Sequence, residues 1–284
     1  LLAISQYVKM SESDARVTGV ADLARQARSE QGGILNGIKT YLRERFPIAL
    51  VAPLSLAAAG MMAGSIASFD HPHGYALITA LMASAMFFFL LRQRVTDEFK
   101  DARHDGANYP NRPVQRGVIT KRQLIWLGAI ATVAEFGSVL LIAGLRHSLL
   151  AALWYLPFLA FSLLTAKEFF VGKWLERHFN IYFISHQLIF VTYAMWAFAL
   201  FKVEPTDTNI GAVIAFVLFM VSVEVARKYE IRLGPNGDPV ADTYLTVWGR
   251  NGSILVAILS TGIGSALLYR LEGNWVFLAI EALL

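Results

Sequence analysis

The chain has 284 residues, 56% of them apolar, and a mean hydropathy of +0.49. These values exclude an ordinary soluble domain and are typical of a polytopic membrane protein. The absence of cysteine excludes disulfides, thiolate metal sites and cysteine nucleophiles. The net charge of +4 does not indicate nucleic-acid binding, because the cations lie at the ends of apolar runs, where lipid headgroups and topology explain them.

In chain order, residues 1–46 are polar or amphipathic, and we expect a cytoplasmic or interfacial segment with one or two surface helices over 21–46. Residues 47–284 form the predicted transmembrane domain. Apolar runs of about 20 residues predict seven spans, near 47–69, 75–93, 123–145, 148–166, 180–201, 208–227 and 253–271. An eighth span begins near Asn274 and is cut off at Leu284, so we expect a C-terminally incomplete domain.

The distribution of basic residues predicts the topology. With the N-terminus inside, all of the 25 Lys and Arg residues lie on the inner side except Arg146, Lys202 and Arg270. This asymmetry satisfies the positive-inside rule. We therefore expect an all-α transmembrane bundle in a bacterial-type inner (plasma) membrane. Its long inner loops should form a cytoplasmic cap that carries the active site.

Four acids stand close together at the inner end of the second predicted span, namely Asp97, Glu98, Asp101 and Asp105. Asp97, Asp101 and Asp105 are spaced i, i+4 and i+8, so on a continuing helix they would face one side and rise about 6 Å per step. Such a ladder needs a counterion, and hard oxygen ligands suit Mg²⁺ bridged to phosphate. The competing interpretation is a solvated helix end whose acids are neutralised by Lys100 and Arg103.

A basic loop, Asn111-Arg112-Pro113-Val114-Gln115-Arg116-Gly117, follows the acids. The order Asp97-Glu98-x-x-Asp101-x-x-x-Asp105 and then Arg112-Pro113-x-x-x-Gly117 resembles the N-D-x-x-D-x-x-x-D and R-P-x-x-x-G signatures of UbiA-type intramembrane prenyltransferases. Asp97 replaces the usual Asn, and Glu98 the usual Asp. The resemblance implies nine spans and Mg²⁺ held by the four acids against the diphosphate of a polyprenyl donor. It also implies that Arg112 and Arg116 bind that diphosphate.

In that family a second motif, D-x-x-x-D at the inner end of the sixth span, holds a second Mg²⁺. Here Glu224 takes the first acidic position, but Lys228 stands where the next acid is expected. Lys228 could bind phosphate directly. The following loop supplies Asp238 and Asp242, whose separation suits metal ligands. For Asp242 the competing interpretation is the N-cap of a short helix beginning near Thr243.

Three further residues are candidates for substrate binding. Lys167 matches the cation of a Y-x-x-x-K pattern in related transferases, although Leu163 replaces the Tyr, and it is assigned to phosphate. Glu135 is the ionisable residue nearest the middle of a span, so it either orients an acceptor or is a protonated or hydrogen-bonded packing residue. His186, at the start of the fifth span, either acts as a base or acceptor ligand or is structural.

Together these features predict an enzyme that transfers a prenyl group, with Mg²⁺, from a polyprenyl diphosphate to an unidentified acceptor within the membrane. The expected partners are this donor, the acceptor and membrane lipids. The alternative is a non-catalytic protein of the same fold that serves as a binding or assembly component of a membrane complex. Lys228 and Leu163 favour the alternative, whereas the four retained acids oppose it.

Overall fold

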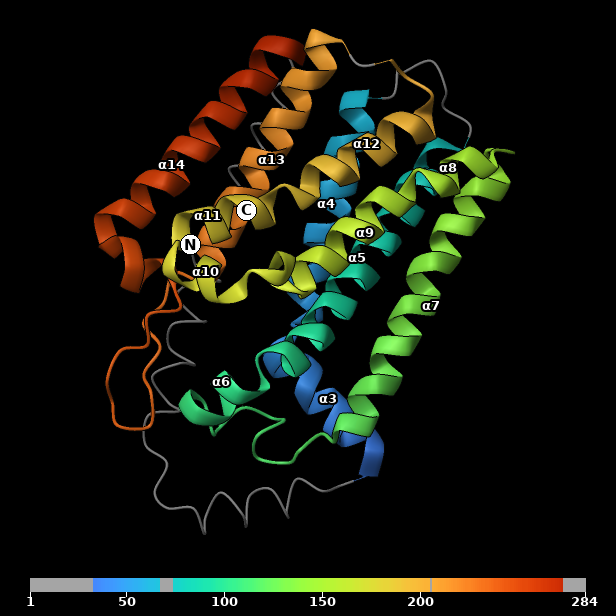
Figure 1. Ribbon diagram of the computed structural model, residues 1–284. Helices are drawn as coiled ribbons and strands as arrows, with labels where there is room; N and C mark the ends of the chain where they lie inside the picture. The colour runs from blue at the N-terminus through green and yellow to red at the C-terminus, as the bar shows by residue number, and fades with distance from the viewer. Residues whose placement is uncertain (1–32, 67–73, 205, 273–284) are drawn as a thin grey trace.

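The computed structural model describes residues 33–66, 74–204 and 206–272 (Figure 1). In this part the chain is helical apart from turns, loops and one isolated antiparallel bridge between Leu233 and Pro239. The all-α prediction is therefore confirmed for the described residues. Residues 1–32, the last residues of the first predicted span and the predicted eighth span near Asn274 lie outside them.

Six helical segments are long and apolar enough to cross a membrane. They are α5 (Tyr75–Lys100), α7 (Lys121–Leu145), α8 with α9 (Leu149–Leu153, Tyr155–Ala166), α11 with α12 (Phe179–Gln187, Ile189–Phe201), α13 (Asp207–Arg227) and α14 (Tyr244–Glu272). A seventh candidate arises only if α3 (Gly33–Arg45) and α4 (Ile48–Ile66), which are bent by 59° at their junction, count as one span. The shorter elements are α6 (Ala102–Asn108), η2 (Glu168–Phe170) and α10 (Gly172–Arg177).

Two predicted boundaries differ from the structure. Helix α5 continues from the predicted end at residue 93 to Lys100, so Asp97 and Glu98 belong to the helix itself. Helix α14 begins at Tyr244, well before the predicted residue 253, and bends at Gly249, where φ is 69°. Glycine adopts this left-handed conformation without a Cβ clash, so the chain changes direction there and continues as a helix.

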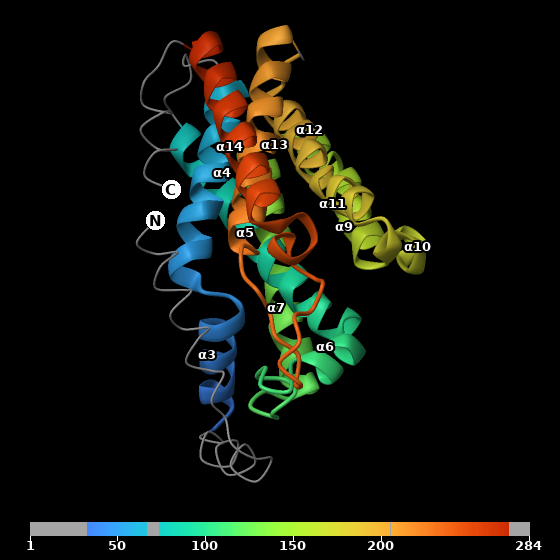
Figure 2. The same cartoon turned by 90° about the vertical axis from the view of Figure 1, so that its left-hand side faces the viewer.

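The bundle is built around α5 and α13. Helix α5 packs against α7 and α4, and α13 packs against α14 and α4, while α12 joins α9 (Figures 1 and 2). Large side chains fill the centre, including the fully buried Phe158, Tyr193, Trp196 and Phe216. Helices α5 and α13 both pack on α4, and they carry the first and second acidic motifs at their C-terminal ends, so both motifs lie at one end of the bundle.

Short helices and loops gather at that end, where α6 stands between the 228–243 loop on one side and the lower ends of α3 and α7 on the other (Figure 1). The contact between α3 and the basic loop is close: a Cβ atom on Gly37 would stand 2.5 Å from the carbonyl oxygen of Val118. We refer to α6, the basic loop 109–120 and the 228–243 loop, together with the C-terminal ends of α5 and α13 and the neighbouring turn 167–170, as the polar end.

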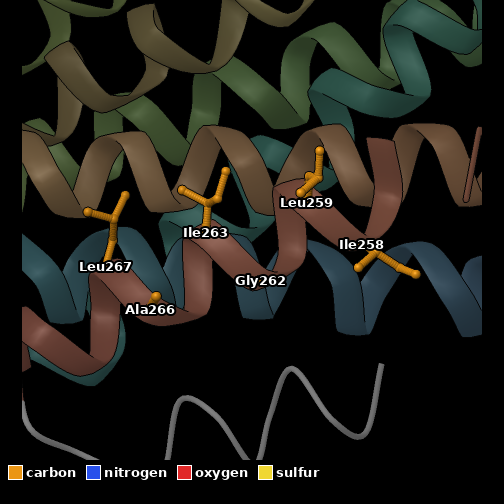
Figure 3. A pocket seen from close by; sticks show the side chains of 6 residues that line it. All are labelled: Ile258, Leu259, Gly262, Ile263, Ala266 and Leu267. Atoms are coloured by element: carbon orange, nitrogen blue, oxygen red, sulfur yellow. The ribbon is translucent and has the colours of Figure 1, made fainter. Parts of the chain in front are cut away.

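The other notable surface feature is an apolar groove along α14, lined by Ile258, Leu259, Gly262, Ile263, Ala266 and Leu267 (Figure 3). None of these side chains carries a polar group that would recognise a substrate headgroup. Such a surface is typical of a helix that faces lipid. The acids of both predicted motifs lie instead at the polar end.

Candidate functional site

The acid ladder bends at Asp101. Helix α5 ends at Lys100, Asp101 has φ −90° and ψ 5°, and α6 begins at Ala102. The backbone hydrogen bonds from Asp101 to Asp97 and from Asp105 to Asp101, both 2.8 Å, continue across the bend. The four acids therefore do not form one continuous helical face.

Glu98 and Asp105 are buried and paired with guanidinium groups. Glu98 Oε1 accepts hydrogen bonds from Arg94 Nη2 (2.7 Å) and Arg45 Nε (3.0 Å). Asp105 pairs with Arg112 Nη1 at 2.5 Å and, more distantly, with Arg45 Nη2 at 3.8 Å. Because a buried charge needs such compensation, these two carboxylates hold α3, α5, α6 and the basic loop together.

Asp97 and Asp101 have a different environment, and their side chains are 39% and 40% exposed. Lys100 Nζ lies 3.7 Å from one oxygen of each, and 3.6 Å from Glu168 Oε1. These distances are longer than hydrogen bonds, and neither aspartate side chain accepts a hydrogen bond from the described residues. Partial burial raises the pKa of Asp101, and the like charges of Asp97 and Asp105 add to this effect, against the opposing influence of Lys100.

Glu168 was not predicted as a site residue. It begins a short turn in which Glu168, Phe169 and Phe170 have φ of 48°, 53° and 60°. Consecutive non-glycine residues in the left-handed region are rare, so the surroundings must hold this turn in place. Phe169 packs against Phe161 and His186. The sequence signal that could have identified Glu168 is the presence of an acid just after the fourth span. The neighbouring Lys167 is exposed and makes no ion pair with the described residues.

In the second motif, Glu224 is surrounded by donors. It accepts hydrogen bonds from Arg227 (2.8 Å at the shortest) and the Tyr244 hydroxyl (3.1 Å), and it pairs with Lys228 Nζ at 3.1 Å. Burial lowers the pKa of Lys228, although Glu224 opposes the shift. Asp238 is exposed in the 228–243 loop and makes no ion pair with the described part of the chain. Glu224 is thus surrounded by protein donors, whereas Asp238 is exposed in the loop.

Asp242 faces α6. Its Oδ2 accepts a 2.6 Å hydrogen bond from the Tyr109 hydroxyl and lies 3.5 Å from Arg232 Nη1 and 3.7 Å from His104 Nε2. At the start of α14, Thr243 Oγ1 accepts the hydrogen bond from the Thr246 N–H at 3.4 Å. Thr243 thus takes the capping role that the sequence offered for Asp242. Burial and the hydrogen bond to Asp242 raise the pKa of Tyr109.

Glu135 is fully buried, and it accepts hydrogen bonds from Arg92 Nε (2.7 Å), Arg92 Nη2 (3.0 Å) and the Tyr155 hydroxyl (2.7 Å). Arg92 Nη2 also donates to Ser162 Oγ at 3.2 Å. From the sequence alone, Arg92 is one of the inner-loop cations. Because α5 extends to Lys100, Arg92 instead lies within the helix and reaches Glu135 on α7. An intramembrane acid needs a partner on a neighbouring span, and this was the signal that could have identified Arg92.

His186 has one ring nitrogen without a hydrogen-bond partner among the described residues. Its Nδ1 lies 2.7 Å from the Tyr182 carbonyl oxygen, which can only accept, so Nδ1 carries the proton. Nε2 of the neutral ring is then a hydrogen-bond acceptor, and it is buried without a hydrogen-bond partner in the described structure. The loop arginines assigned to diphosphate have protein partners: Arg112 pairs with Asp105, and Arg116 Nη2 donates to Glu44 at 2.8 Å.

Among the described residues, no group of three or more His, Cys, Asp or Glu side chains has the arrangement of a formed metal site. Asp97, Asp101 and Glu168 surround the Lys100 ammonium instead. Their oxygen donors have the chemistry that Mg²⁺ prefers, with water and phosphate completing its coordination. Comparisons of the chain with protein-family models, curated proteins and solved structures each found no match.

Proposed function

We propose that this protein is an integral membrane prenyltransferase that binds a prenyl diphosphate with Mg²⁺ at the polar end. The observation that carries the proposal is the contrast between the acids. Glu98, Asp105 and Glu224 are each paired with protein cations at 3.1 Å or less, whereas the ion-pair distances of Asp97, Asp101 and Glu168 are all 3.6 Å or more; all three acids lie near Lys100, and Asp97 is also 3.9 Å from Arg94 Nη1. Such carboxylates are suited to bind a further cation.

In this proposal Asp97 and Asp101 hold the ion, and Glu98 and Asp105 position them. When bound, Mg²⁺ neutralises the diphosphate and stabilises its departure. Lys167, which is exposed, provides a cation for the phosphate oxygens, and Lys100 would join it once its carboxylates are occupied by metal. Arg112, Arg116 and Lys228 contribute mainly through their carboxylate partners, which is a narrower role than the direct phosphate binding predicted from the sequence.

His186 is the proposed base. As the allylic C–O bond of the donor breaks and the acceptor nucleophile bonds to the allylic carbon, the acceptor loses a proton, and His186 Nε2 can take it. Tyr182 and Phe169 pack against the imidazole and restrict its orientation, with ring centroids 4.1 Å and 5.9 Å from it. Contact between Glu135 and the acceptor remains a prediction, because the protein already supplies three hydrogen bonds to its carboxylate.

Because Glu224 is already engaged by Arg227, Lys228 and Tyr244, we expect one metal ion at the site and not two. The same contacts also favour the alternative function, a non-catalytic membrane subunit. The two proposals differ in whether Mg²⁺ increases diphosphate binding. The concentration of cations at the polar end supports a cytoplasmic site in a bacterial-type inner membrane.

Mass spectrometry of lipid extracts from cells that express the wild type or Asp101→Asn would test the catalytic proposal and identify the acceptor. We expect a prenylated product that depends on Asp101. The matched control is Asp207→Asn, an exposed acid in the first turn of α13, at the other end of that helix from the second motif, and it should leave the product unchanged. Identical extracts from wild type and Asp101→Asn would contradict the proposal.

A further inference from the structure

The 228–243 loop is joined to α6 by a hydrogen bond between residues far apart in the sequence. Tyr109, the C-cap residue directly after α6, donates a hydrogen bond from its hydroxyl to Asp242 Oδ2 at 2.6 Å. Arg232 and His104 approach the same oxygen but remain at 3.5 Å and 3.7 Å. The tyrosine hydroxyl is therefore the closest contact that Asp242 makes to α6.

Tyr109 is also connected to the acid ladder. The Arg112 guanidinium lies over its ring, 3.8 Å from the centroid, and the same guanidinium pairs with Asp105. Asp105 is in turn 3.8 Å from Arg45 Nη2, and Arg45 donates to Glu98. A continuous set of contacts thus leads from the loop of the second motif to the helix that carries Asp97.

We propose that Tyr109 is a positioning residue whose hydroxyl, through Asp242, holds the 228–243 loop against α6, so that both inner loops cover the diphosphate site as one unit. The role at the site rests on the proposed function. The attachment of the loop does not, and it can be measured without any ligand. In this account Asp242 needs only a hydrogen-bond acceptor, whereas a metal ligand at this position would need its negative charge.

Tyr109→Phe removes the hydroxyl and retains the ring on which Arg112 stacks. We expect hydrogen exchange of the backbone amides in 230–243 to become about tenfold faster, with α7 and α13 unchanged, because the hydrogen bond between Tyr109 and Asp242 is lost. Tyr229→Phe is the matched control: Tyr229 lies near the start of the same loop, and its hydroxyl makes no hydrogen bond to the described residues. Its exchange should equal that of the wild type.

Two substitutions at Asp242 separate the possibilities. Asp242→Asn retains an acceptor and should keep exchange within about twofold of the wild type, whereas Asp242→Ala should match Tyr109→Phe. Exchange in Tyr109→Phe equal to the wild type would overturn the proposal, as would exchange in Asp242→Asn as fast as in Asp242→Ala.

The role at the site is tested by calorimetric titration with farnesyl diphosphate and Mg²⁺. Tyr109→Phe should weaken binding about tenfold and Tyr229→Phe should not change it. Unchanged affinity in Tyr109→Phe would contradict the coupling to the site. If the wild type binds no diphosphate at all, the proposed function fails, while the exchange result still decides whether Tyr109 holds the loop.

Discussion

Replacing Glu135 with Gln should strongly destabilise the protein. The substitution preserves the size of the side chain but removes the charge that Arg92 faces at 2.7 Å, and both side chains are largely buried. Breaking a buried ion pair by altering one partner costs about 3–5 kcal/mol, because the remaining charge is left uncompensated. This is a large fraction of a total stability of about 5–15 kcal/mol.

The assay is equilibrium unfolding in detergent micelles, with Glu204→Gln, an exposed acid in a loop, as the control. The control should shift stability by less than about 0.5 kcal/mol. Replacing both partners, as Arg92→Met with Glu135→Leu, should recover much of the loss, because a well-packed apolar pair needs no charge compensation. A cost below about 1 kcal/mol for Glu135→Gln, or additive effects in the double variant, would refute the importance of the pair.

The same variant tests the substrate assignment of Glu135. If Glu135→Gln is folded at the assay temperature and raises the acceptor KM while donor affinity stays intact, Glu135 contacts the acceptor. If neither changes, Glu135 serves packing alone.

Three further predictions concern the acids and their cations. Lys100→Met should tighten Mg²⁺ binding at least about tenfold in a direct titration, because the Lys100 ammonium competes with the metal for the same carboxylates. Two unit charges about 4 Å apart interact by about 4 kcal/mol at an effective dielectric constant of 20. Weaker Mg²⁺ binding in this variant would show that Lys100 supports the site. Because folding raises the pKa of Asp101, ionisation of this carboxyl group lowers the stability of the folded protein above the folded pKa and has no effect below the unfolded pKa. Asp101→Asn should therefore be at least as stable as the wild type at pH 7 without Mg²⁺, and a markedly lower melting temperature of this variant would contradict the prediction. The Mg²⁺ affinity of the wild type should also fall as the pH decreases, already at pH values above 3.8. Glu98→Gln should reduce Mg²⁺ affinity about 10- to 100-fold through displacement of Asp97, as loss of an outer partner does in metal sites, and an unchanged affinity would remove Glu98 from the site.

Helix positions were predictable because lipid-facing and buried faces are both apolar in a membrane bundle, so the spans stand out as continuous apolar runs. The C-terminal end of α5 could not be predicted in this way, because the charged residues from Arg92 to Lys100 have the composition of a loop. Three of them have partners on other elements that hold this part of the helix in place: Glu98 on α3, Arg92 on α7 and Lys100 at Glu168.

The sequence was sufficient to locate the candidate site, but it did not show which acid is paired with a cation and which is free to bind a ligand. The spacing of Asp97, Glu98 and Asp101 shows which acids share a helix face, yet adjacent acids point in different directions by about 100°. Which of them meets a guanidinium depends on contacts such as that from Arg45, 53 residues away from Glu98. Glu168 was missed for the same reason, because its position follows from a left-handed turn and not from a motif.

The most direct test of the central claim is the affinity of the purified protein for farnesyl diphosphate, measured with and without Mg²⁺ in the wild type, Asp101→Asn and Asp207→Asn. We predict that Mg²⁺ strengthens binding at least about 100-fold (about 2.8 kcal/mol) in the wild type and Asp207→Asn, and by less than about threefold in Asp101→Asn. Binding that is independent of Mg²⁺, or equal in all three proteins, would contradict the account.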